Sequence, residues 1–241
     1  MRYVLSLLLL FSALLQAEEG MPPLPADLGQ AELPAMQRGL AAFQRHCASC
    51  HSTHYQRYNQ VATDLQISAA QMNAYIMTGA KPFELMENAM SKKEAARWFG
   101  MAPPDLTLVA RVRGEAWLYR FLHGFYRDAK RPFGVNNLQS PYTTMPHVLE
   151  DLQGIAEPLI TMDKGKDKPK AQVTGVQMAQ GGQLSPEEYD RLVRDLISYL
   201  TYTAEPMKQQ RQAIGQWVMA FLLFFLLLVW LLKKEYWKDV H

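Results

Sequence analysis

Residues 47–51 read Cys47-Ala48-Ser49-Cys50-His51, and this pentapeptide decides how the rest of the chain is interpreted. Its two cysteines are the only ones among 241 residues. Positions i, i+3 and i+4 share one face of a helix, so two thiols and an imidazole can face the same group. Cys-x-x-Cys-His is the attachment pattern of c-type haem, in which the thiols bond the vinyl groups and the imidazole binds the iron. The motif therefore predicts one haem c, attached covalently through Cys47 and Cys50, with His51 as an iron ligand.

Two other kinds of site use paired cysteines, and neither fits the surrounding sequence. A thioredoxin-like dithiol needs a preceding strand in a βαβ unit, which is not visible here, and would leave His51 without a role. A four-ligand zinc site needs a second cysteine pair. Both cysteines are therefore assigned to haem, which leaves none for a disulfide.

The composition excludes several classes of protein. With 25 Lys and Arg against 23 Asp and Glu, the net charge is +2, which argues against a nucleic-acid-binding protein. Hydrophobic residues make up 49% of the chain, so long disordered regions are not expected. About 190 residues remain between the two ends of the chain, enough for one compact domain with its own core.

The N-terminus has the pattern of a secretory signal peptide over residues 1–17. A single basic residue, Arg2, precedes an apolar run over residues 4–15, and acidic residues follow Ala17. The run is short for a membrane span, so cleavage near Ala17 is expected, with an uncleaved anchor as the alternative. The signal predicts export of the domain that follows.

The C-terminus predicts a membrane anchor over residues 213–232. These twenty positions are apolar or glycine except Gln216, and at 1.5 Å per residue they span about 30 Å, the thickness of a bilayer core. A buried core helix is the alternative, but no amphipathic stripe is present. The lysines that follow favour a cytoplasmic tail over residues 233–241. We therefore expect a single-pass protein of the bacterial inner membrane, in contact with lipid, with its haem domain, residues 18–207, in the periplasm.

The exported part is expected to be mainly helical. A proline-rich arm over residues 20–34 should be extended, and residues 127–184, rich in proline and glycine, predict a long loop with one hairpin. Helices are predicted over residues 35–50, 68–78, 91–99, 105–113 (with Asp105 as a cap), 115–126, and from Ser185 onward. The expected fold class is a mainly α, c-type haem domain with long loop insertions, plus one C-terminal transmembrane helix.

The other side of the iron is less constrained by the sequence. We expect the Nδ1–H of His51 to donate to a backbone carbonyl. A methionine thioether as sixth ligand would suit electron transfer, whereas an open position would suit gas or peroxide chemistry. The loop methionines beside proline are Met101 and Met145. Distance from His51 favours Met101, but the residues alone do not decide between the two.

Several segments, in their order and spacing, resemble the cytochrome c1 family, the haem subunit of the quinol–cytochrome c oxidoreductase. Arg38-Gly39 and Phe43 precede the attachment motif, and Pro103-Pro104-Asp105-Leu106 leads into Arg111-Val112-Arg113. Ala204-Glu205-Pro206 precedes a basic stretch and the anchor. The resemblance covers nearly the whole mature chain.

The resemblance implies roles for further residues. It implies that Met145, rather than Met101, is the second iron ligand, and that Pro104 lines the haem pocket. It places Arg113 near the haem propionates, where a fixed guanidinium would neutralise a carboxylate, with a surface arginine as the alternative. Trp117 falls near the family's pocket tyrosine. The resemblance assigns no role to His54, His123 and His147, and the extra disulfide of several members cannot form here.

The function that the resemblance implies is electron transfer. Electrons would come from a Rieske iron–sulfur protein and pass to a soluble or membrane-anchored c-type cytochrome, with the anchor beside a cytochrome b subunit. The chain would act as a subunit of the oxidoreductase, without separate substrate chemistry. One alternative is a free-standing, membrane-anchored cytochrome c that delivers electrons to a terminal oxidase. Another is a haem sensor or peroxidase with an open sixth position.

Overall fold

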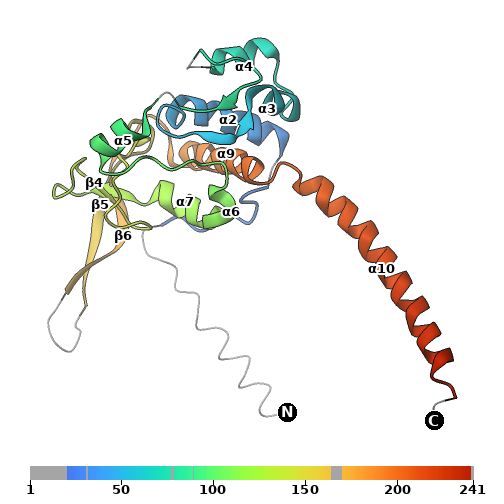
Figure 1. Cartoon of the computed structure of the whole chain (residues 1–241). Coiled ribbons are helices and arrows are strands. Elements are labelled where there is room, and N and C mark those ends of the chain that lie inside the picture. Colours follow the sequence, from blue (N-terminus) through green and yellow to red (C-terminus); the bar gives the residue numbers. More distant parts are fainter. Residues whose placement is uncertain (1–20, 31, 77–78, 89, 164–169, 240–241) are drawn as a thin grey trace, which may run out of the picture. The chain divides into compact units, whose positions relative to one another are not determined.

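The computed structural model describes residues 21–30, 32–76, 79–88, 90–163 and 170–239 (Figure 1). The predicted signal peptide, residues 1–17, lies outside these described residues, and so does the charged run over residues 164–168. The chain divides into two compact units, Met1–Ala204 and Glu205–His241. Each unit is described separately below.

The first unit contains helices and antiparallel strand pairs. The strands pair as β1 with β2, β3 with β4, and β5 with β6. In chain order the elements are α2 (Leu33–His46), β1 (Thr53–Arg57), α3 (Tyr58–Asp64), α4 (Ala69–Tyr75), β2 (Leu85–Met86), α5 (Lys92–Phe99), α6 (Val109–Arg113), α7 (Glu115–His123), β3 (Phe125–Arg127), β4 (Val135–Asn137), α8 (Glu150–Gln153), β5 (Gly154–Asp163), β6 (Lys170–Gly181) and α9 (Pro186–Ala204).

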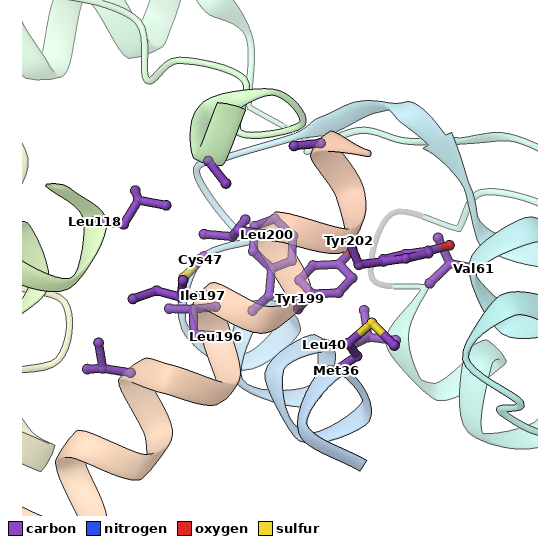
Figure 2. Packing of buried hydrophobic residues seen from close by; sticks show 14 of the residues in the cluster. Met36, Leu40, Cys47, Val61, Leu118, Leu196, Ile197, Tyr199, Leu200 and Tyr202 are labelled. Atoms are coloured by element: carbon purple, nitrogen blue, oxygen red, sulfur yellow. The ribbon is translucent and has the colours of Figure 1, made fainter. Parts of the chain in front are cut away.

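The centre of this unit is the packing of α2 against α9. Both helices carry apolar residues at three- and four-residue spacing, which places those residues on one face. Leu40 of α2 and Ile197 and Tyr199 of α9 are 0% exposed. Figure 2 shows these side chains together, with Cys47 in the same cluster. The core therefore reaches directly to the predicted haem attachment segment.

A glycine and an ion pair set the contact between the two helices. A Cβ atom at Gly39 would lie 2.0 Å from the Asp195 carbonyl oxygen, so the backbones approach too closely for a side chain. Next to it, Arg38 donates two hydrogen bonds to the Asp195 carboxylate, from Nε at 2.6 Å and from Nη2 at 2.8 Å. Arg38-Gly39, part of the family resemblance, thus joins α2 to α9.

Several predicted helices are shorter than expected, among them α4, which was predicted over residues 68–78 and ends at Tyr75. The prediction of a helix capped by Asp105 was wrong: α6 begins at Val109, and the Asp105 carboxylate instead accepts hydrogen bonds from the backbone N–H groups of Thr107 and His54, at 2.9 and 2.7 Å. The contact with His54, on β1, is long-range and is not visible in local sequence. The predicted helix over residues 115–126 ends at His123, because Phe125 and its neighbours pair with β4.

The proline-rich stretch over residues 127–184 contains more regular structure than a loop. It includes β4, which pairs with β3 just before the stretch, and a long hairpin, β5–β6, which projects from the helices (Figure 1). The predicted hairpin is confirmed. The rest of the stretch was predicted to be loop, but it also contains β4 and α8. Pro158 lies within β5, which a two-stranded hairpin tolerates because each strand has a free edge.

The second unit is one long helix, α10 (Lys208–Tyr236). Within the described residues, one segment is long and apolar enough to span a membrane, Gln210–Tyr236, with a mean hydropathy of 2.3. It contains the predicted anchor, residues 213–232. Its apolar side chains are exposed all round, as expected for a helix whose surroundings are lipid.

Candidate functional site

The Cys-x-x-Cys-His motif lies on a turn that continues α2. The N–H of Cys47 donates to the Phe43 carbonyl at 2.8 Å. The N–H groups of Cys50 and His51 both donate to the Cys47 carbonyl, at 3.0 and 2.9 Å. The regular helix ends at His46, four residues earlier than predicted, but this tight turn keeps both cysteines and the histidine together.

The two cysteines are not joined to each other and lie in different surroundings. Cys47 is buried in the core, whereas Cys50 is half-buried. Burial, with a smaller contribution from Cys50, raises the pKa of Cys47 to about 12, so its thiol stays protonated at neutral pH. A redox-active dithiol requires the opposite shift, towards a thiolate. A helix rather than a strand precedes the motif, and both observations count against a thioredoxin-like site.

His51 is held by a backbone carbonyl, as the sequence led us to expect. Its Nδ1 lies 2.7 Å from the carbonyl oxygen of Pro104. A carbonyl can only accept, so Nδ1 carries the proton and Nε2 keeps its lone pair for a metal. Burial lowers the pKa of His51, and this outweighs the opposing effects of the Pro104 carbonyl and of Asp105. A neutral imidazole with a free Nε2 is the form that binds haem iron.

Pro104 reaches His51 because the segment around it runs beside the segment that follows the motif. The N–H of Leu106 donates to the Ser52 carbonyl at 2.9 Å, and the N–H of Tyr55 donates to the Thr107 hydroxyl at 3.3 Å. The bond from His54 to Asp105 continues the same contact. The Pro-Pro-Asp segment is therefore fixed beside the residues that follow the motif by hydrogen bonds from three backbone N–H groups.

A cavity of about 640 Å³ opens beside the motif. Its volume falls within the range of small-molecule and cofactor sites. Cys50, Ser52, Asn88, Pro103 and Pro104 are among the residues that line it. The donor set of two thiols and an imidazole fits a c-type haem, and the cavity lies on the Cys50 side of this set.

Arg113 begins a row of stacked rings. Its guanidinium lies 5.1 Å from the ring centroid of Trp117, which stacks on Phe121 at 4.9 Å. Phe121 contacts Phe125 edge-on at 5.2 Å, and Phe125 stacks on His147 at 4.6 Å. This aromatic row, from Trp117 to His147, connects Arg113 to the loop that carries Met145.

The loop of Met145 is held by Asn136 and Asn137. Asn137 is 0% exposed; its Oδ1 accepts from the N–H groups of Gln139 and Ser140, and its Nδ2 donates to the Phe121 carbonyl at 2.7 Å. Asn136 accepts from the N–H of Tyr142 at 2.8 Å. Met145 itself is half-buried.

The predicted site residues thus fall into two groups. Cys47, Cys50, His51 and Pro104 are brought together. Arg113 lies at one end of the aromatic row, and Met145 precedes His147, the ring at its other end, by two residues. Among the described residues, no hydrogen bond or ring contact joins this row to His51. Met101, the other loop methionine, is 59% exposed, so Met145 is the better shielded of the two.

The three histidines without an assigned role all have other contacts. Nδ1 of His54 lies 2.6 Å from Glu87, and Nδ1 of His123 lies 2.9 Å from the Tyr119 carbonyl. His147 stacks on Phe125. The sequence also gave no signal for Asn88, whose amide contacts the motif, because that contact joins residues far apart in the chain.

Comparison with known proteins decides the family. Residues 26–240 match the sequence profile of the Cytochrome C1 family. The chain belongs to the cytochrome c1 family. It is 44% identical to cytochrome c1 of Allochromatium vinosum, over 98% of this chain and 96% of the relative. It is also 42% identical to a protein named ammonia monooxygenase gamma subunit, from Nitrosomonas europaea, over 90% of this chain and 88% of that one. A more distant relative, cytochrome c1 of Rhodospirillum rubrum, is 24% identical over 88% of this chain and 84% of its own length.

Membership of the cytochrome c1 family implies a haem, which agrees with the donor set built by α2 and the Pro104 segment. The expected fold class is confirmed: a mainly α unit with one long apolar C-terminal helix.

Proposed function

We propose that this chain is the electron-transfer haem subunit of a membrane-bound quinol–cytochrome c oxidoreductase. The observation that carries the proposal is the His51 ring, fixed by the Pro104 carbonyl directly after the two cysteines. A neutral imidazole held in this way is a ligand of fixed orientation, which suits a centre that must change oxidation state without rearranging.

Cys47 and Cys50 hold one haem c covalently in this proposal, and His51 and Met145 bind its iron. When bound, the haem supplies one-electron exchange between ferric and ferrous iron. The thioether of Met145 stabilises the ferrous state, and the loop pinned by Asn136 and Asn137 limits its movement.

Arg113 supplies positive charge near the haem propionates. Its guanidinium is held over the Trp117 ring, so little side-chain conformational entropy is lost when a carboxylate binds. Pro104 contributes through its carbonyl oxygen and by lining the pocket. The chain's part is thus to hold, orient and shield the redox group.

The topology of the proposal follows the two ends of the sequence. Residues 1–17 act as a signal peptide, and residues 18–207 form a periplasmic haem domain. The anchor, residues 213–232, crosses the bacterial inner membrane once and leaves residues 233–241 in the cytoplasm. The positively charged residues after the anchor support this orientation.

The partners in this proposal are those of an electron-transfer chain. A Rieske iron–sulfur protein delivers the electron, a c-type cytochrome accepts it, and a cytochrome b subunit packs beside the anchor in lipid. The chain carries electrons as a subunit of the oxidoreductase and has no substrate chemistry of its own.

Purification from solubilised membranes tests the proposal. The chain should retain its pigment through acid–acetone extraction and should bring down a multi-span b-type cytochrome together with a Rieske protein. A colourless chain would contradict haem attachment. Recovery with a terminal oxidase alone would favour the free-standing cytochrome, and binding of carbon monoxide to the reduced native protein would favour a sensor or peroxidase.

A further inference from the structure

Asn88 contacts both neighbours of His51 in the chain. Its side-chain Nδ2 donates to the Cys50 carbonyl at 2.5 Å, and its backbone N–H donates to the Ser52 hydroxyl at 3.0 Å. Cys50 and Ser52 stand directly before and after His51. One residue thus holds the peptide on either side of the proposed iron ligand.

Asn88 is itself held in place. It follows β2, which pairs with β1 through Thr53 and Met86, so its backbone is anchored beside the end of the motif. Its Oδ1 accepts a hydrogen bond from the N–H of Met90 at 3.2 Å. Both ends of the side-chain amide are therefore engaged, which fixes its orientation.

A second segment holds the same peptide through other atoms. The Pro104 carbonyl accepts from the His51 ring, and the N–H of Leu106 donates to the Ser52 carbonyl at 2.9 Å. The residues from Cys50 to Ser52 are consequently fixed by two segments that are remote from each other in sequence. The Pro104 segment fixes the ring, and Asn88 fixes the backbone from which the ring projects.

We propose that Asn88 is a positioning residue for the haem iron, which sets the orientation of His51 by holding the Cys50 carbonyl and the Ser52 hydroxyl. This inference rests on the proposed function, because it requires His51 to bind haem iron. Contacts that orient a ligand, together with the access of water to the site, control the reduction potential of a metal. Asn88 also lines the cavity beside Cys50 and Pro104, so its loss admits water. Water stabilises the more highly charged ferric state, and the potential falls.

Three variants separate this role from a contribution to folding alone. Asn88→Ala removes the side-chain donor and acceptor, and Ser52→Ala removes only the hydroxyl that accepts from the backbone of Asn88. The matched control is Tyr202→Phe, which deletes the 2.7 Å hydrogen bond from the Tyr202 hydroxyl to Asp64, away from the motif. Each variant loses hydrogen bonding, but only the first two act on the residues that flank His51.

The measurement is a redox titration of each purified, haem-bearing protein, alongside its thermal unfolding. Asn88→Ala should shift the equilibrium towards the ferric state at least about threefold, which for one electron is about 28 mV. Ser52→Ala should give a smaller shift of the same sign. Tyr202→Phe should lower the unfolding temperature and leave the equilibrium unchanged.

If the ferric–ferrous equilibrium shifts no further in Asn88→Ala than in Tyr202→Phe, the inference is overturned. The proposed function would then still stand. If Asn88→Ala does not fold, Ser52→Ala decides, and an unchanged equilibrium in that variant overturns the inference. A wild-type chain that carries no haem overturns both the inference and the proposed function.

Discussion

Arg38 on α2 and Asp195 on α9 form a two-pronged ion pair, with N–O distances of 2.6 and 2.8 Å, beside the closest approach of the two helices. The Asp195 side chain is only 10% exposed, whereas that of Arg38 is 55% exposed. The two partners are therefore solvated to different extents, because water reaches the Arg38 guanidinium but is largely excluded from the Asp195 carboxylate.

Arg38→Ala should cost more stability than Asp195→Ala. The first change leaves a buried carboxylate without its partner, while the second leaves a guanidinium that water can solvate. We expect about 1.5–3 kcal/mol for Arg38→Ala, the range for hydrogen bonds to charged groups. Urea unfolding of both variants tests this, with Arg45→Ala on the same helix as a control that should have little effect. A larger loss in Asp195→Ala would contradict the assignment of the buried partner.

Gly39→Ala should destabilise the protein, although alanine is the better helix former by about 1 kcal/mol. The added Cβ would meet the Asp195 carbonyl oxygen at 2.0 Å and the Tyr199 Cβ at 2.8 Å, so the helices would have to separate. Overpacking of this kind costs about 1–3 kcal/mol. Gly181→Ala, where the new Cβ meets nothing within 4 Å, is the matched control. Equal thermal unfolding of the two variants would show that the helices separate without cost.

Met145→Lys should lower the reduction potential sharply and abolish the absorption band that arises from sulfur bound to iron. The reason is the loss of the proposed thioether ligand, which would favour the ferrous state. Met101→Leu should leave the band intact, because Met101 is 59% exposed and lies in the Pro-Pro segment. Optical spectra and redox titration of the two proteins test this. The reverse pattern would move the ligand to Met101.

His123 should make the stability depend on pH. Burial lowers its pKa from the ordinary value of 6.5, despite opposing effects of the Tyr119 carbonyl and of Asp190. The folded state therefore prefers the neutral ring, and the unfolded chain takes up a proton more readily. The contribution of His123 is fully present above about pH 6.5 and is lost as the pH falls towards the lower folded pKa.

His123→Phe keeps an aromatic ring against Tyr119 and Tyr189, which contact His123 at 4.3 and 5.2 Å between ring centroids. The variant should lose less stability than the wild type between pH 7.5 and pH 5, measured as urea midpoints at each pH. An unchanged loss would mean that other groups carry the acid sensitivity.

The sequence predicted the parts that depend on local pattern. Cys47, Cys50 and His51 are recognised by spacing alone, since their chemistry needs those residue types on one short turn. The C-terminal helix is recognised by length and apolar character, because a bilayer demands both. The loop methionine was not recognisable in this way: the residues left Met101 and Met145 open, and family resemblance chose between them.

The strands were harder to anticipate. One hairpin was predicted within residues 127–184, but the prolines and glycines there gave neither its position nor the length of its strands, and Pro158 pairs opposite Val176. Similarly, Asp105 was expected to cap a helix, but it binds the backbone of His54 on another element. In both places, contacts with residues distant in the chain decided the structure, and the local conformational preference of the sequence did not.

The amino-acid order alone thus determined that this chain has a haem attachment motif and a membrane-spanning helix, because covalent chemistry and bilayer thickness act on consecutive residues. Only the tertiary structure decided what holds that motif. The Pro104 carbonyl on His51, the Asn88 amide on Cys50 and the Arg38–Asp195 pair each join residues at least 38 positions apart. Such contacts exist only once the core has formed, because burial between α2 and α9 brings these segments within hydrogen-bonding distance.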